Sequence, residues 1–209
     1  MSAVRLVLAM SSLLVLALTP ACALLGKSDP MSPRYFSPEG AATPHAQDPI
    51  TSGLELRLGR VDSDAFIRDR MIHRDSAYEL GYYDERAWTE KPETYVRRAI
   101  EREIFDEHGV RRIVSGDATT LDVDVVAFEE VRKPEHVGRV QLTFVVYDDR
   151  SVRVSRTIVV DRPIAEAKDS AAAAAAVSAI GDALAAAAHE VANSVVTELL
   201  SESKAAKAP

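Results

Sequence analysis

Alternating apolar and polar residues indicate a β-rich domain within residues 54–201. Apolar side chains recur at nearly every second position over residues 54–58, 121–125, 140–146 and 152–160. A period of two is typical of a strand with one buried face. The short polar connections between the last three segments predict an antiparallel meander, because parallel strands need longer connections.

A shorter strand pair precedes this meander. Apolar residues at 71–72 and 78–83 flank the polar run Arg74-Asp75-Ser76. The pattern predicts two short strands joined by a turn at that run.

Two helices complete the predicted domain. Pro92 is suited to the first turn of one helix, and Gly109 is suited to its end. The second helix is predicted to begin at Asp169 or Ser170 and to run towards Leu200, with large apolar residues three and four positions apart among many alanines. The predicted fold class is therefore α+β: an antiparallel, mostly meander sheet packed on one face by two helices, the second long and alanine-rich.

Residues 1–21 have the pattern of a lipoprotein signal peptide. Arg5 is their only charged residue, and residues 6–18 are apolar apart from two serines. This run is shorter than the roughly 20 residues that cross a bilayer. A basic start, a short apolar core and small residues at the exit are typical of a secretory signal. Cleavage is predicted after Ala21.

Cys22, the only cysteine, is the predicted site of lipid attachment. Its place after Thr19-Pro20-Ala21 resembles the bacterial lipobox, although Leu18 lies four residues before the cysteine and the usual pattern has leucine three before. The resemblance implies a thioether-linked diacylglycerol and an N-acyl chain such as palmitate, with no other cofactor. Two or three chains make a stable anchor, whereas one holds only reversibly.

A soluble secreted protein with an incidental cysteine is the alternative interpretation. An unpaired thiol in an oxidising compartment is a liability, however, and lipidation removes it. Ala23 rather than aspartate follows the cysteine. By resemblance to proteobacterial lipoproteins, this implies sorting to the outer membrane, with the domain facing the periplasm.

Residues 22–53 are predicted to form a proline-rich tether, because five prolines among small polar residues disfavour helices and sheets. Within it, Tyr35 and Phe36 could form an edge strand near residues 34–37. The polar, Ala/Lys-rich residues 202–209 are predicted to be a disordered tail.

Composition excludes several classes of function. The chain has 209 residues, 25 basic and 32 acidic, and a net charge of −7. Nucleic-acid binding needs clustered basic residues that this sequence lacks. The five histidines, at positions 45, 73, 108, 136 and 189, show no ligand-like spacing. Asp122 and Asp124 alternate with apolar residues and are interpreted as a solvated strand face. No catalytic or metal site is predicted, and the sequence favours a binding protein.

Three motifs lie in the first half of the predicted domain: His73-Arg74-Asp75-Ser76, Tyr82-Tyr83, and Arg86-Ala87-Trp88-Thr89-Glu90-Lys91-Pro92. Together they resemble the ABC-type transport auxiliary lipoproteins of MCE systems, the paraquat-inducible protein C kind. In that family an arginine-containing strand leads to a Trp-Ala-Glu-Pro-like run that opens a helix. Here Thr89 replaces the alanine and Lys91 is inserted before Pro92. The family also has a lipobox, a tyrosine-rich first strand and a long final helix.

The resemblance implies an outer-membrane lipoprotein that serves as accessory subunit of an MCE-type ABC lipid transport system. Its expected partners are a periplasmic MCE-domain protein and, through it, the ABC permease and ATPase; the lipoprotein itself would not be an enzyme. A different outer-membrane interaction module, such as a cell-wall synthase activator or a pore assembly factor, is the alternative. A small enzyme or metal binder is a third class.

Arg86 and Trp88 are candidate partner-binding residues, because arginine and tryptophan dominate interface hot spots. A core tryptophan packed over the first helix is the alternative for Trp88. An exposed sheet edge is a second candidate binding surface, since it could accept a strand from a partner or from another copy in a homo-oligomer.

Overall fold

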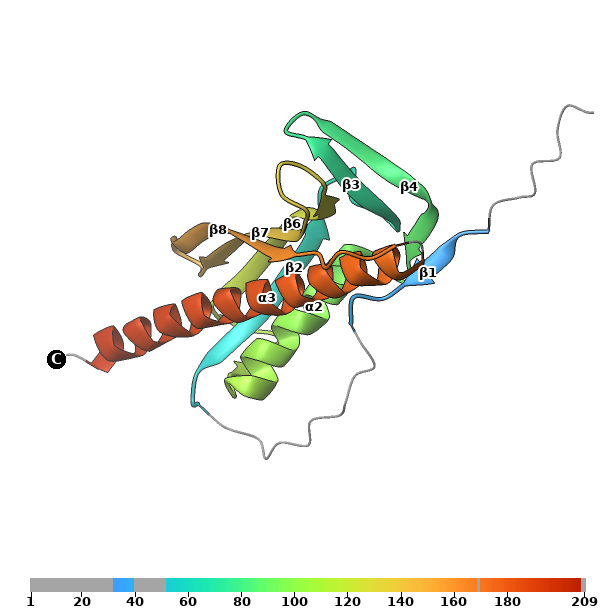
Figure 1. Ribbon diagram of the computed structural model, residues 1–209. Coiled ribbons are helices and arrows are strands. Elements are labelled where there is room, and N and C mark those ends of the chain that lie inside the picture. The colour runs from blue at the N-terminus through green and yellow to red at the C-terminus, as the bar shows by residue number, and fades with distance from the viewer. Residues whose placement is uncertain (1–31, 40–51, 169, 208–209) are drawn as a thin grey trace, which may run out of the picture. The chain divides into compact units, whose positions relative to one another are not determined.

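The computed structural model describes residues 32–39, 52–168 and 170–207 (Figure 1). The chain divides into two units, Met1–Ser32 and Pro33–Pro209, and the fold below is that of the second. The predicted signal peptide, Ala21, Cys22 and most of the predicted tether lie outside the described residues.

The described residues form one mixed sheet, two helices and a π-helical turn. The strands are β1 (Arg34–Phe36), β2 (Glu55–Ser63), β3 (Arg70–Ser76), β4 (Glu79–Trp88), β5 (Arg111–Arg112), β6 (Thr120–Val131), β7 (Val137–Tyr147) and β8 (Val152–Pro163). The two helices are α2 (Pro92–Glu101) and α3 (Ser170–Lys207), and the π-helical turn η1 (Arg102–Glu107) directly follows α2.

Strand β6 organises the sheet. It pairs antiparallel with β7 along its whole length, and β8 continues this meander. On its other side, β6 pairs parallel with β2 as far as Val125 and parallel with β3 from Glu129 onward. A bulge between Val125 and Ala127 lies where one partner gives way to the other. Strand β4 pairs with β3, β1 with β4, and β5 with β2.

The prediction of an antiparallel sheet is correct for β6–β7–β8 and for the β3–β4 hairpin, and wrong for the remaining pairs. Strands β2 and β3 run parallel to β6, β1 runs parallel to β4, and β5 runs parallel to β2. Parallel neighbours need a crossover connection. The chain supplies one for β6: in chain order, α2 comes after β2 and β3 and before β6.

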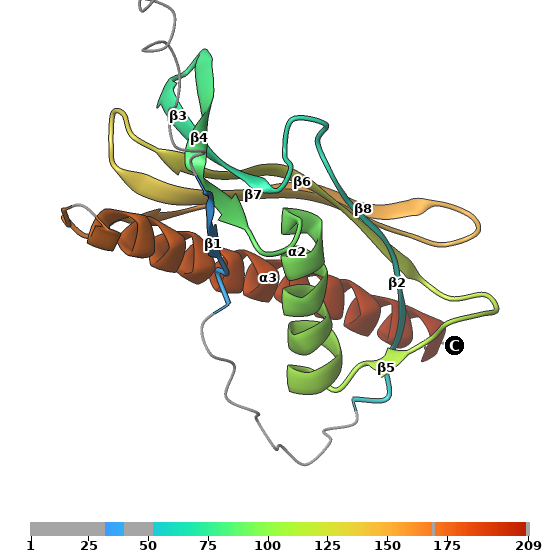
Figure 2. The same cartoon turned by 90° about the vertical axis from the view of Figure 1, so that its right-hand side faces the viewer.

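Both helices cover the same face of the sheet, as predicted (Figure 2). Helix α3 lies along β6, β7 and β8, and α2 packs against β2, β6 and α3. Gly138 of β7 permits the close approach of α3, because a Cβ there would lie 2.7 Å from the backbone nitrogen of Ile180. By length and composition α3 could span a membrane, but half of its most apolar window is buried within this domain.

The core lies between the helices and the sheet. Its largest fully buried side chains include Trp88, Tyr95, Phe128, Phe144, Leu56, Met71, Ile100 and Leu142. The apolar face of the first helix is buried as its spacing implies, at Val96, Ala99, Ile100 and Ile104. Gly109 follows with φ of 61°, a left-handed conformation suited to a helix end.

The domain extends beyond its predicted bounds at both ends. The edge strand expected near residues 34–37 is present as β1, and Pro38 after it contacts Gly181 of α3. Residues 33–39 therefore belong to the folded unit rather than to the tether. At the other end α3 continues to Lys207, so residues 202–207 are helical where a disordered tail was predicted.

Candidate functional site

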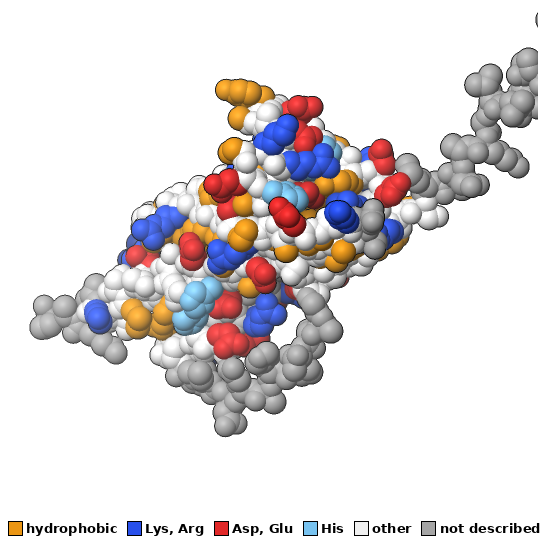
Figure 3. All heavy atoms as spheres, in the orientation of Figure 1, with side chains coloured by type: hydrophobic (Ala, Val, Ile, Leu, Met, Phe, Trp, Pro, Cys, Tyr) orange, Lys and Arg blue, Asp and Glu red, His pale blue; other side chains and the backbone are white. Residues whose placement is uncertain are grey.

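The β3–β4 hairpin projects from the sheet beyond the two helices (Figures 1 and 2). Tyr78 in its turn is 99% exposed, and Leu80 and Tyr82, two positions apart on β4, are each 40% exposed. Figure 3 shows hydrophobic side chains at this end of the domain. Grouped exposed apolar side chains mark interaction sites more often than isolated ones do.

The opposite face of the hairpin carries a polar cluster centred on Tyr83. The guanidinium carbon of Arg86 lies 4.0 Å from the centre of the Tyr83 ring, and that of Arg132 lies 5.0 Å from it. The ring of His73 meets Tyr83 edge-on, with 4.9 Å between ring centres. Cation–π contacts of this kind hold the phenol ring against two arginines.

A buried carboxylate anchors this cluster. Glu130 of β6 is 5% exposed and accepts a 2.6 Å hydrogen bond from the Tyr83 hydroxyl. Nε2 of His136 lies 2.8 Å from Glu130 Oε1, and a guanidinium nitrogen of Arg86 lies 3.6 Å from Glu130 Oε2. A buried charge persists only when it is paired and hydrogen-bonded, and Glu130 meets both conditions.

A second network joins the hairpin to β6. Arg74 of β3 makes a two-nitrogen contact with Glu129, at 2.6 and 3.2 Å, and Glu129 is 1% exposed. Arg132 bonds Asp75 at 3.1 Å and the Tyr83 hydroxyl at 2.9 Å. These contacts fix the projecting hairpin to the central strand at several points.

The environment of Tyr83 keeps its hydroxyl protonated. Burial raises the pKa of Tyr83, and the hydrogen bond to Glu130 raises it further, against the opposing effect of Arg132. Tyr83 is therefore a neutral donor at physiological pH. Its hydroxyl is committed to Glu130 and Arg132, so the cluster positions the hairpin rather than offering a free acid or base.

Trp88 lies in the core, and of the two predicted partner-binding residues only Arg86 reaches solvent, at 22% exposure of its side chain. Trp88 is 2% exposed and packs edge-on against Phe128 and Tyr95, with ring centres 5.2 and 6.3 Å away. The alternative interpretation, a core tryptophan beside the first helix, is the one that the structure bears out.

The run from Thr89 to Pro92 joins β4 to α2. Tyr95 is fully buried, and its hydroxyl lies 2.7 Å from Thr89 Oγ1 and accepts a 2.9 Å hydrogen bond from the amide of Glu90. A buried tyrosine hydroxyl without a partner would be costly. The motif therefore satisfies a core tyrosine and sets where α2 begins.

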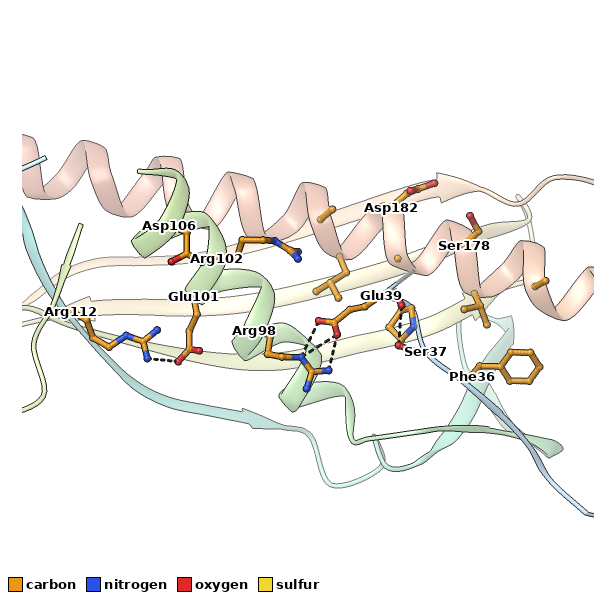
Figure 4. Close-up of a pocket in the computed structure, with 16 residues that line it drawn as sticks. Phe36, Ser37, Glu39, Arg98, Glu101, Arg102, Asp106, Arg112, Ser178 and Asp182 are labelled. Atoms are coloured by element: carbon orange, nitrogen blue, oxygen red, sulfur yellow. Dashed lines mark hydrogen bonds and ion pairs between the residues drawn. The ribbon is translucent and has the colours of Figure 1, made fainter. Parts of the chain in front are cut away.

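A groove with a cavity volume of about 850 Å³ lies between α2, α3 and the segment after β1 (Figure 4). Val177 and Leu184 of α3 line its apolar side. Arg98 of α2 contacts Glu39 through Nε and Nη2, with a shortest distance of 2.8 Å, and also contacts Glu90. These ion pairs hold residues 36–39 against the two helices.

The chain matches the model of a known protein family. The model of the ABC-type transport auxiliary lipoprotein component matches residues 37–192, most of the chain. The protein belongs to this family. The resemblance expected from the Arg74–Pro92 motifs is thereby confirmed, and the family description names a transport component rather than an enzyme.

Solved structures show the same fold as this auxiliary lipoprotein. A crystal structure of a Xanthomonas campestris protein of family DUF330 aligns with a TM-score of 0.68 at 20% identity, covering 82% of this chain and 99% of that one. A crystal structure described as an uncharacterized protein aligns with a TM-score of 0.61 at 10% identity, covering 78% and 99%. Among curated proteins, no match is found.

The buried carboxylates of this auxiliary lipoprotein were not predicted as site residues. Glu129 and Glu130 continue an apolar strand pattern, and adjacent acids after such a run resemble a strand end. Their one signal in the sequence was a departure from alternation at residues 128–131, and all four of these residues are buried in the structure.

Proposed function

We propose that the protein is an outer-membrane lipoprotein accessory subunit of an MCE-type ABC lipid transport system. It binds the periplasmic MCE-domain protein and holds it at the membrane through the acyl chains on Cys22. Membership of the auxiliary lipoprotein family supports the link to an ABC transporter. The lipobox-like sequence ending at Cys22 supports the anchor.

The projecting β3–β4 hairpin is the observation that carries the binding role. It exposes Tyr78, Leu80 and Tyr82, while Tyr83 on its other face is fixed to buried Glu130. A pre-ordered aromatic surface binds a partner at a lower entropic cost than a flexible one. Arg86, on the Tyr83 side of the hairpin, is a partly exposed cation close to this surface.

In this proposal the lipoprotein catalyses nothing, and another subunit hydrolyses ATP. The arginines and carboxylates around Tyr83 bond to one another, so they serve to hold the hairpin. Strand β8 pairs only with β7 among the described residues, and Val159 on it is 51% exposed. This edge offers a second contact surface, through which copies could join in a homo-oligomer.

Site-specific photo-crosslinking in intact cells tests the binding role. A photoreactive residue at position 78 or 82 is expected to capture the MCE-domain protein, identified by mass spectrometry. The control is position 114, because Val114 is also exposed, at 84%, but lies in the connection after β5, away from the hairpin. Capture of a cell-wall synthase or a pore assembly factor, with no MCE protein, would support the alternative function instead.

The anchor is tested by Cys22→Ser. This variant is expected to lose its acyl chains, to escape signal cleavage before position 22, and to leave the outer-membrane fraction after a salt wash. A Cys22→Ser protein that is processed and retained like the parent would contradict the anchoring role. Hairpin capture in the same cells reports separately on partner binding.

A further inference from the structure

We propose that Glu103, His108 and His189 form a binding site for a divalent transition metal ion of the zinc type. One ligand atom from each side chain lies within 4.8 Å of the other two. Glu103 Oε2 is 3.0 Å from His189 Nδ1, and the two imidazole rings lie nearly parallel with centres 6.4 Å apart. Such a grouping of three ligand side chains occurs once within the ranges that the structure describes.

The π-helical turn η1 brings two of the ligands onto one side of the chain. The amide of His108 donates a 3.0 Å hydrogen bond to the carbonyl of Glu103, five residues earlier. An α-helix would bond residues four apart, and positions five apart would then point in different directions. A π turn is rare and is found frequently at functional sites. Here it places Glu103 and His108 one turn apart on the same side of the helical segment.

Helix α3 supplies the third ligand from 81 positions further along the chain than His108. Ala188 and Ala192, on either side of His189 along the helix, are fully buried, and Ile104 of η1 is fully buried as well. Small side chains let η1 and α3 approach closely enough for their polar groups to meet. Figure 3 shows histidine side chains at the surface over α3, beside acidic ones.

The donor atoms select the class of ion. Two imidazole nitrogens and one carboxylate oxygen suit zinc and the neighbouring late first-row divalent ions, whereas magnesium and calcium prefer oxygen ligands alone. Metal–ligand distances near 2.1 Å put tetrahedral ligand atoms about 3.4 Å apart. The ligand atoms of Glu103 and His189 are already that close. Rotation of the imidazole of His108 or His189 would bring the third ligand atom to a similar distance.

Exposure at the cluster suits capture of an ion from solvent. The side chain of His189 is 59% exposed, which gives an ion access, while that of Glu103 is 19% exposed and so is partly desolvated. Three protein ligands leave a fourth position open to water or to another molecule. A bound ion would tie α3 to the segment that joins α2 and β5.

Isothermal titration with zinc chloride tests the site, on the full chain purified in detergent without a polyhistidine tag and stripped with a chelator. One ion is expected to bind per chain. His108→Ala and His189→Ala are each expected to weaken zinc binding at least about tenfold, because each removes one of three ligands. The matched control is His136→Ala: His136 also contacts a carboxylate, Glu130, but lacks a second histidine, and its removal should leave zinc affinity unchanged.

Two further measurements separate metal binding from a loss of structure. Zinc is expected to raise the melting temperature of the parent and of His136→Ala, but not of the His108→Ala/His189→Ala double variant, whose circular dichroism without metal should match the parent. Cobalt(II) should give visible absorption bands in the parent that disappear in His189→Ala. Parent protein that binds no zinc, or ligand variants that bind it as tightly as the parent, would overturn the proposal. The result is independent of which transporter the protein serves.

Discussion

The hydroxyl of Tyr83 on β4 donates a 2.6 Å hydrogen bond to the carboxylate of Glu130 on β6, across 47 positions of sequence. This bond joins the projecting hairpin to the central strand of the sheet. Because Glu130 is 5% exposed, its charge depends on Tyr83, His136 and the nearby arginines for compensation. The hairpin surface and the stability of the core are therefore coupled through one side chain.

Replacing Tyr83 by phenylalanine is expected to lower the free energy of unfolding by about 1–3 kcal/mol, because a part-buried hydrogen bond to a charged group is lost. Urea unfolding followed by circular dichroism measures the change. Tyr78→Phe is the matched control: Tyr78 is 99% exposed on the same hairpin, and its variant should stay within about 0.5 kcal/mol of the parent. Equal effects in the two variants would contradict the anchoring role of Tyr83.

Truncation of Trp88 is expected to destabilise the fold, because this side chain lies in the core and not at a partner surface. Trp88→Ala is expected to cost about 3–5 kcal/mol, as large cavities beneath a helix do. Chemical denaturation of this variant and of Val114→Ala, a truncation at an 84% exposed site, gives the comparison. A stable Trp88→Ala protein that had lost only its partner would instead support an interface role.

Gly181 of α3 is predicted to resist substitution by alanine. An alanine usually stabilises a helix interior by about 1 kcal/mol relative to glycine. Here its Cβ would lie 2.3 Å from the carbonyl oxygen of Pro38, so we expect net destabilisation of about 1–3 kcal/mol. Ser178→Ala, one turn earlier on an exposed position, should be neutral or slightly stabilising. A stabilising Gly181→Ala would mean that residues 36–39 do not dock on α3.

Asp148 gives the β7–β8 turn a sensitivity to acid. Hydrogen bonds from the amide of Arg150, the guanidinium of Arg153 and the amide of Ser151 lower the pKa of Asp148 to about 2. A lowered pKa in the folded state means that this contribution to stability is present above about pH 4 and is lost as the pH falls towards 2.

Urea midpoints at pH 6, 4 and 2.5 test this expectation. Asp148→Asn should remove part of the decline that the parent shows between pH 4 and 2.5. Asp149→Asn, which removes a neighbouring carboxylate that is 65% exposed, serves as the control and should follow the parent. Parallel profiles for the parent and Asp148→Asn would argue against the predicted role of the turn.

Much of the fold could be predicted because its signals are local. Alternation at residues 121–125 and 140–146 predicted β6 and β7, and the apolar spacing from Val177 to Leu199 predicted α3. The motifs between Arg74 and Pro92 together suggested the family, and their last run sets how β4 joins α2. Each of these patterns lies within one element or spans one short connection.

The candidate sites could be predicted only in part. Arg86 and Trp88 were both expected to bind a partner; the side chain of Arg86 is partly exposed, whereas Trp88 beside it is buried. Whether a strand residue is covered depends on elements that are distant in sequence, and β4 is also irregular in this stretch. Tyr83, at the centre of the cluster, showed no signal beyond its place in a tyrosine pair.

By itself the sequence determined the strands of the meander, the two helices, the lipobox-like N-terminus and the resemblance to a family, because periodicity and short motifs act between near neighbours. Tertiary structure alone decided the parallel pairing of β2 and β3 with β6, the burial of Glu130 and the meeting of Glu103 with His189, 86 positions apart. Those outcomes depend on crossover connections and on register. They bring together side chains that lie far apart in the sequence.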